Sequence, residues 1–246
     1  MAESRHMDEC AIVGFGTAQA TLPGIAQMRK DPAPGRPSTM EFQVLKHADE
    51  HTVLALAAML DGVSAVPGSA PFAEWAVVAA PRWPGRFGTA TAIERYRADG
   101  ARGVSPLAIP NVCLHSLSGT VSLVFQMRGP NFGVGGGLSS IADGLLAGLG
   151  LQLEHQPPGT WVIFSEWDVE PGQVDAHGEP RARALALALG PVTQAPSARR
   201  LRLRPTRGVP PKPVCPRLAG LTDCLLDPAT TPWMCTLDWG MELSIA

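Results

Sequence analysis

The sequence predicts an α/β fold in which a mostly parallel sheet is flanked by helices. Three observations support this prediction. Several short, strongly apolar runs are typical of buried strands, and longer segments between them carry apolar residues at helical spacing. The two kinds of segment alternate along the chain, as parallel strands joined by crossover helices require. The hydrophobic content of 45% is ample for the core of such a fold.

The elements can be placed in order along the chain. Residues 17–39 are expected to be loop-rich because they hold four prolines. The segment 128–150 combines a turn, a short strand, a run of glycines and a helix, and the other elements are arranged around it. The expected strands are 10–16, 75–80, 131–134, 160–165 and 183–189, and the expected helices are 41–60, 89–97 and 141–155.

Charge and hydropathy exclude several functional classes. The formal net charge is −2, so the chain as a whole lacks the basic character of a nucleic-acid-binding protein. No apolar run approaches the length of a membrane span, and the start of the chain, MAESRHMDEC, does not resemble a signal peptide. We therefore expect no membrane span.

Cysteine and histidine spacing argues against a disulfide framework and a metal site. Five scattered cysteines suit reduced thiols, so we expect a cytoplasmic location. His47 and His51 lie one helical turn apart, but no third ligand is near in sequence. We expect both histidines to face solvent beside Asp49 and Glu50. The sequence indicates no metal and no cofactor.

The glycine run Gly135–Gly137 forms a backbone corner before a helix N-terminus, where N–H groups converge. The string GVGGGLSS matches neither GxGxxG nor GxxxxGK[ST], so nucleotide binding is not indicated. Ser139 or Ser140 could act as a nucleophile with His115 as base, but no GxSxG is present. The simpler interpretation is that the two serines cap the helix.

The run from Ser105 to Ser140 resembles the nucleophile region of β-ketoacyl synthases, the condensing enzymes of fatty-acid and polyketide synthesis. The resemblance rests on a Ser-Pro, a second proline, a glycine before an apolar run, Arg-Gly-Pro and a corner of small residues. The matched positions are Ser105, Pro106, Pro110, Gly119, Arg128, Gly129, Pro130 and Ser140. It implies the N-terminal half of the thiolase fold, a five-stranded sheet flanked by helices.

The catalytic cysteine of that family falls on Leu138 in this chain. Leucine has no lone pair for acyl transfer, and the family's two histidines belong to a half that this sequence does not contain. The chain is therefore most similar to the chain length factors of type II polyketide and aryl polyene pathways, in the short form that keeps only the N-terminal half. The resemblance implies no catalytic residue and no activity for the chain alone.

The same resemblance implies partners and further sites. The expected partners are a full-length β-ketoacyl synthase, as a heterodimer, and an acyl carrier protein. The expected acyl-tunnel residues are Ala108, Val112, Cys113 and Ser116. The expected dimer interface is the strand formed by Asn131, Phe132, Gly133 and Val134.

The chain changes character near residue 199. Residues 1–198 are expected to form the ketosynthase-like domain, and residues 199–246 a basic, proline-rich segment with a C-terminal cap. The basic run suits a solvated face, a docking patch for an acidic carrier protein, or an edge strand with Leu201 and Leu203 on one side. Trp233 and Trp239 are expected to cover apolar surface.

Two other classes of function stay open at this point. One is an autonomous acyl hydrolase or transferase that uses Ser139 or Ser140 with His115. The other is a carrier or assembly protein with no link to acyl chains.

Overall fold

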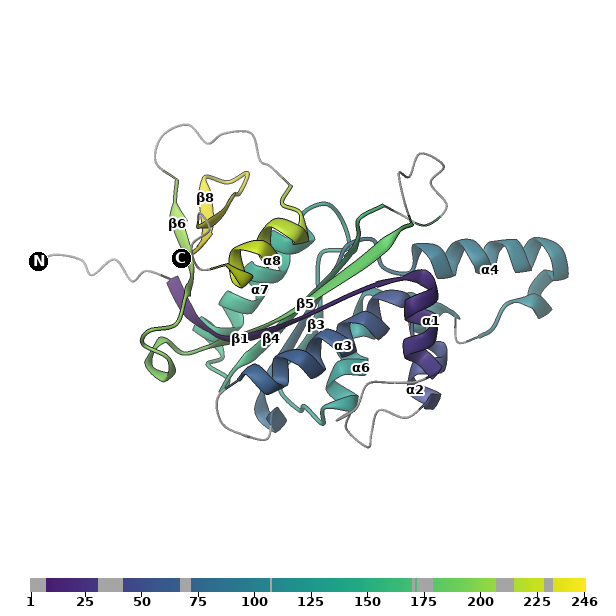
Figure 1. Ribbon diagram of the computed structural model, residues 1–246, viewed down its shortest axis with the longest axis horizontal. Coiled ribbons are helices and arrows are strands. Elements are labelled where there is room, and N and C mark those ends of the chain that lie inside the picture. The colour runs from purple at the N-terminus through teal and green to yellow at the C-terminus, as the bar shows by residue number, and fades with distance from the viewer. Residues whose placement is uncertain are drawn as a thin grey trace, which may run out of the picture.

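The computed structural model describes residues 8–30, 42–66, 72–106, 108–169, 171, 179–206, 215–227 and 232–246. An eight-stranded sheet runs through this part of the chain, and helices cover both of its faces (Figure 1). The predicted α/β class is therefore confirmed.

The sheet is mixed, with strand order β3-β2-β4-β5-β1-β6-β8-β7. Only the pairs β2–β3 and β2–β4 are parallel, and the five other pairs are antiparallel. The prediction of a mostly parallel, five-stranded sheet was wrong, because hydrophobic period locates strands but does not fix their direction or partners. The strands are β1 (Asp8–Thr21), β2 (Ala76–Pro81), β3 (Asn131–Gly133), β4 (Thr160–Trp167), β5 (Arg181–Gly190), β6 (Arg200–Pro205), β7 (Trp233–Thr236) and β8 (Met241–Ile245).

The predicted helix 41–60 is broken into two. The first piece ends at His47, and Asp49 caps the second, since its carboxylate accepts a hydrogen bond of 2.7 Å from the backbone N–H of Thr52. Residues 17–30, expected as loop, continue β1 and then form a helix, and residues 31–39 lie outside the described residues. The helices are α1 (Leu22–Lys30), α2 (Phe42–His47), α3 (Glu50–Ala65), α4 (Arg86–Asp99), α5 (Ala108–Val112), α6 (Leu114–Val124), α7 (Ser140–Glu154) and α8 (Leu218–Leu226).

Alternation along the strands divides the interior into two cores. The leucines of β5, at Leu185, Leu187 and Leu189, face α7 and α8, while its alanines face α3 and α6. The small alanine face lets a helix approach closely. At Gly16, for example, a side chain would collide with the backbone of α3 at Gly62. Figure 1 shows α7 and α8 on one side of the sheet and α3 with α6 on the other.

Helix α4 projects away from the body of the molecule (Figure 1). None of its residues is buried, and Ile93 and Tyr96 on its surface are exposed. The helix leaves the sheet just after β2 and returns through the 3-10 turn Gly100–Gly103 to α5. It therefore belongs to the same side of the molecule as the β3 edge.

The sheet continues across residue 198. β6 pairs with β1 on one side and with β8 on the other. Residues 200–205 at the start of the basic run therefore form an interior strand of the sheet and not an edge strand. Trp233 is buried in the α7–α8 core, but Trp239 is 62% exposed, so the expected cap includes only the first tryptophan. A division into domains at residue 198 stays a sequence prediction. Within the described ranges, no helix is long and apolar enough to cross a membrane.

Candidate functional site

The glycine corner lies between β3 and α7, beside the end of β2. Gly135 and Gly136 adopt φ values of +77° and +88°, which L-residues other than glycine rarely tolerate. The carbonyl of Gly136 accepts a hydrogen bond of 3.3 Å from the backbone N–H of Trp83, which follows β2. The sharp turn thus joins two parallel strands and a helix N-terminus at one place, as the sequence predicted.

Leu138 lies at this corner with 48% of its surface exposed. Neither neighbouring serine caps α7 with its side chain. The hydroxyl of Ser139 donates a hydrogen bond of 2.7 Å to the Asp143 carboxylate, and Ser140 is buried. The expectation of serine side-chain caps was wrong, because Asp143 in the first turn takes the Ser139 hydroxyl.

His115 forms no hydrogen bond with either serine within the part of the chain that the structure describes. Its ring Nδ1 contacts the hydroxyl of Ser118 at 3.3 Å, on the same helix. A nucleophile and its base need to lie within hydrogen-bond reach, about 2.6–3.2 Å apart. The pairing that an autonomous serine hydrolase would use is therefore not formed.

The predicted interface strand is the outermost strand of the sheet at one end. Phe132 has 46% of its surface exposed, whereas Asn131, Gly133 and Val134 are half-buried. The N–H of Val134 donates 2.8 Å to the carbonyl of Ala79 on β2. The other side of β3 pairs with no strand of the described sheet, and whether a partner pairs there stays a prediction.

Close packing explains two glycines at β3, Gly129 of the matched motif and Gly133 of the strand itself. A side chain at Gly129 would collide with the backbone of Trp75 at the start of β2. A side chain at Gly133 would collide with the carbonyl of Leu114, which begins α6. The amide of Asn131 fastens the strand to the same helix through a hydrogen bond of 2.8 Å to Ser122. These three residues thus hold β3 between β2 and α6.

The predicted tunnel residues follow one another at the junction of α5 and α6. The side chain of Ala108 lies outside the described residues. Cys113 is exposed, with its thiol 3.3 Å from the carbonyl of Pro110, and the Ser116 hydroxyl donates 3.0 Å to the carbonyl of Asn111. Val112 points the other way and packs against Gly85 and Gly88. A role for the four residues in an acyl tunnel stays a prediction.

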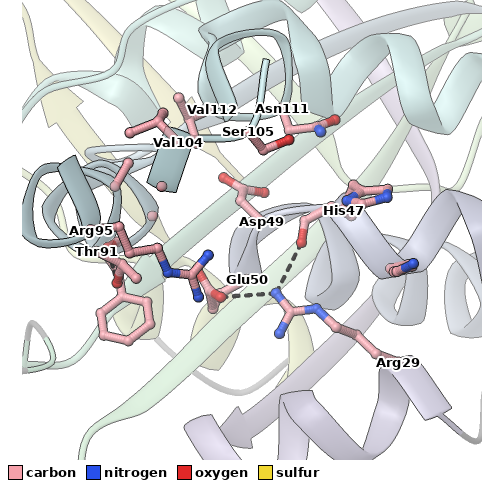
Figure 2. Close-up of a pocket in the computed structure, with 16 residues that line it drawn as sticks. Arg29, His47, Asp49, Glu50, Thr91, Arg95, Val104, Ser105, Asn111 and Val112 are labelled. Carbon is pink, nitrogen blue, oxygen red and sulfur yellow. Dashed lines mark hydrogen bonds and ion pairs between the residues drawn. The ribbon is translucent and has the colours of Figure 1, made fainter. Parts of the chain in front are cut away.

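Val112 also lines a cavity of about 310 Å³ that the sequence did not reveal (Figure 2). Helices α1, α2, α3, α4 and α5 all contribute to its lining. Asp49 and Glu50 form its acidic part, while Lys46 and Arg95 bring positive charge. The Arg29 guanidinium joins the break between α2 and α3, with bonds of 2.9 Å to the carbonyl of Ala48 and 2.8 Å to the Glu50 carboxylate.

The predicted pair of solvent-facing histidines is half correct. His47 is exposed, but His51 is buried, and its Nδ1 lies 2.9 Å from the Ser165 hydroxyl. The break at Asp49 changes the helical phase, which places the two rings in different surroundings. Among the described residues, no group of three His, Cys, Asp or Glu is placed to hold a metal ion.

Four of the described arginines between residues 199 and 217 are engaged within the molecule. Arg199 donates to the carbonyl of Cys224, Arg200 to that of Ala195 at 2.9 Å, and Arg202 forms an ion pair of 2.8 Å with Glu9. Arg217 reaches the carboxylate of Glu166 at 3.3 Å. These contacts favour a structural role for the run over a free docking patch.

The buried thiols of Cys10, Cys224 and Cys235 lie on β1, α8 and β7, in the core on the α7–α8 face of the sheet. Burial raises the pKa of the Cys10 thiol to about 12, with a smaller contribution from Glu9, so the group stays protonated and unreactive at neutral pH. Cys224 and Cys235 are also buried, whereas Cys113 and Cys215 are exposed.

Neither the known protein-family models nor the curated proteins contain a match to this chain. Solved structures do. A chain of the ketosynthase ApeO in complex with its chain length factor ApeC from Xenorhabdus doucetiae superposes with a TM-score of 0.60 and 13% identity, over 96% of this chain and 98% of that one. This chain has the ketosynthase fold.

Chains from two further solved complexes also superpose on this chain. The ishigamide ketosynthase/chain length factor matches with a TM-score of 0.54 and 18% identity, over 80% of this chain and 67% of that one. The AntDE:AntF complex, a type II acyl carrier protein with its ketosynthase, matches with a TM-score of 0.54 and 14% identity, over 78% and 67%. This chain thus spans about two thirds of the length of those two. The first match, at 96% coverage, includes most of segment 199–246.

Proposed function

We propose that this chain is a non-catalytic chain length factor that pairs with an active β-ketoacyl synthase and shapes its acyl tunnel. The observation that carries the proposal is the glycine corner. It keeps the strand, turn and helix N-terminus of the fold, but it presents the hydrocarbon side chain of Leu138 where the resemblance places the nucleophile. Leucine offers no group for acyl transfer.

The sheet edge beside the corner supports the pairing. β3 ends the sheet, and the exposed Phe132 on it lies near α6, where Leu123 is also exposed. Exposed apolar side chains beside an open sheet edge suit contact with another chain. The ketosynthase fold and the matches to complexes favour a ketosynthase as the covering chain.

The polyketide type of pathway and the carrier protein belong to the same proposal. The matched complexes include a type II polyketide acyl carrier protein with its ketosynthase. The aryl polyene assignment rests on the sequence resemblance alone. The proposed division of labour leaves the condensation to the partner, and the present chain contributes tunnel wall and interface.

The proposal can be tested with two matched substitutions at opposite ends of the sheet. Phe132→Glu places a charge on β3, and Met234→Glu does the same on β7, where Met234 is 61% exposed. A β-ketoacyl synthase partner should co-elute with the native chain and with Met234→Glu. Phe132→Glu should weaken the complex by at least about 30-fold, a loss of roughly 2 kcal/mol typical of a central apolar contact.

Activity assays complete the test. The native chain alone should give no condensation product from malonyl- and acyl-loaded carrier protein, and Leu138→Cys should stay inactive because no activating histidines are supplied. Addition of the ketosynthase should restore product. Turnover by the isolated chain would overturn the proposal, and so would an equal loss of binding in Phe132→Glu and Met234→Glu.

A further inference from the structure

Helix α4 has two faces with different surroundings. On one face, Thr91 and Arg95 line the cavity between α4 and the body of the molecule (Figure 2). The opposite face consists of exposed residues at helical spacing that do not line the cavity: Arg86, Ala90, Ile93 and Arg97. We call these four residues the outer stripe of α4.

The outer stripe is exposed although it contains a large apolar side chain. Ile93 is 48% exposed, and Tyr96 beside the stripe is 58% exposed. The elements that α4 contacts most are the turn 100–103 and α5, its neighbours in the chain, so the rest of the described fold leaves this face open. Arginine and tyrosine are enriched where protein interfaces gain most of their binding energy. The stripe therefore suits a protein partner.

The stripe is also basic. Residues 86–103 contain four arginines and two acidic residues, and both charged members of the stripe are arginines. Among the ion pairs of the described residues, none involves Arg86 or Arg97. Arg86 stacks over the ring of Trp83 at 4.9 Å, which orients its guanidinium without neutralising the charge. The stripe thus differs from the segment 199–217, where four arginines have partners inside the molecule.

The size and charge of the stripe favour one kind of partner. The helical rise places Arg97 about 17 Å from Arg86 along the axis, and a single helix face of this length suits a transient contact. In a two-fold contact between copies of this chain, arginines would meet arginines, which disfavours self-association. An acidic protein that binds and leaves in each cycle, such as an acyl carrier protein, meets both requirements.

We propose that the outer stripe of α4 docks the acyl carrier protein, with Arg86 and Arg97 paired to carboxylates on either side of an apolar contact with Ile93. The inference rests on the proposed function, which supplies the carrier protein as a partner. α4 follows β2 and projects from the same side of the molecule as the β3 edge (Figure 1). A carrier protein on α4 is therefore held on the side where the ketosynthase is proposed to bind.

The test measures carrier binding to the free chain, so that contacts between the carrier and the ketosynthase do not contribute. The probe is a fluorescently labelled type II acyl carrier protein in its phosphopantetheine form, and its affinity should fall several-fold between about 50 and 200 mM salt. Arg97→Glu should weaken binding by about tenfold or more, because a like charge then faces the carrier. Ile93→Ala should weaken it by about threefold. Both changes lie on an exposed helix face, so the fold should be retained.

Two matched controls come from the β7 end of the molecule. Arg204→Glu reverses an exposed arginine on β6, and Leu226→Ala truncates a leucine on α8 that is 60% exposed. Both should leave the carrier affinity within about twofold of the native value. A carrier variant with lysine in place of the carboxylate that meets Arg97 should restore binding to Arg97→Glu.

The outcomes separate this inference from the proposed function. If the native chain binds no carrier, or if Arg97→Glu and Arg204→Glu lose binding equally, the inference is overturned and the pairing with the ketosynthase stands. The inference also falls if Arg97→Glu abolishes co-elution with the ketosynthase, since the stripe then belongs to that interface. Carrier binding that depends on Arg97, in a chain that forms no ketosynthase complex, supports the docking surface and overturns the proposed function.

Discussion

The two ends of the sheet differ in how they are secured. At one end, β3 is three residues long and is held by its parallel neighbour β2 and by α6. At the other end, β7 and β8 form an antiparallel hairpin attached to β6, and α8 is fastened to the core by a buried carboxylate. The β3 end combines an exposed edge with the glycine corner and the projecting α4, whereas the β7 end is built into the fold. Partner binding is therefore expected at the first and structural support at the second.

The largest predicted effect concerns the buried carboxylate that secures the β7 end. Glu166 is 2% exposed, pairs with Arg82 at 3.1 Å and accepts a hydrogen bond of 2.9 Å from the N–H of Leu218 at the start of α8. Glu166→Ala should lower the free energy of unfolding by about 3–5 kcal/mol, because the buried Arg82 loses its partner. Urea unfolding measures the change.

The control for Glu166 is a neighbouring ion pair that is exposed to solvent. Asp168 and Arg183 lie 2.8 Å apart and are each about one third exposed. Asp168→Ala should cost about 0–1 kcal/mol, because solvent already screens the pair. Similar costs for the two variants would contradict the view that α8 is anchored by Glu166.

A second prediction compares glycines near the two ends. Gly133→Ala on β3 should cost about 1–3 kcal/mol, since its new methyl group collides with the backbone of α6 at Leu114. Gly240→Ala beside β8 has room, because the nearest atom is 3.8 Å away, but its φ is +78°. That backbone strain should lower the free energy of unfolding by about 1 kcal/mol. Thermal unfolding of both variants gives the order, and the reverse order would show that β3 is free to shift.

A third prediction uses the buried thiol of Cys10, on the stretch of β1 that pairs with β6. Its pKa is raised from 9.0 to about 12 in the folded chain, so above pH 9 the unfolded chain gains from ionisation and the folded chain does not. Stability should be nearly unaffected below about pH 8 and should fall by about 1–2 kcal/mol between pH 8.5 and 10.5. Cys10→Ala should reduce this fall, and an unchanged pH profile would contradict the assignment.

The last prediction compares the two ends of the sheet by cysteine labelling, which should affect the stability of the chain least. Iodoacetamide should modify Cys113 and Cys215 in the free chain and leave the three buried cysteines intact. Addition of the ketosynthase should protect Cys113, near the β3 end, while Cys215 stays reactive. Mass spectrometry of the peptides would reveal the opposite pattern if the partner binds the β7 end.

The sequence predicted the positions of the inner strands better than their arrangement. The apolar run 160–165 and the alternation in 183–189 correspond to β4 and β5. The direction of β5 depends on pairing with β1, some 170 residues away, which a local pattern does not contain. A strand with Leu201 and Leu203 on one side was one of three interpretations of the basic run, but its place inside the sheet was not predicted, because that place depends on pairing with β1 and β8.

The site was predictable only where backbone geometry determines it. Three consecutive glycines before a helix indicate a corner in any fold, and the corner was found. The cavity at Asp49 was missed because its walls come from the five helices α1 to α5, whose packing against one another no local sequence pattern contains. The Asp49-Glu50-His51-Thr52 run was itself a cap signal inside an apparently continuous helix, and it could have revealed the break.

The position of β1 in the middle of the sheet has a consequence for synthesis in the cell. This first strand pairs along its length with β5, so Ala11 cannot pair with Gly190 until that residue has been translated. At about 5–20 residues per second, the delay is roughly 10–35 s. During that time the buried face of β1 has no native strand beside it, and the nascent chain is exposed to aggregation and to chaperones. Production of this protein should therefore depend on the rate of translation and on chaperone supply, apart from any need for its partner.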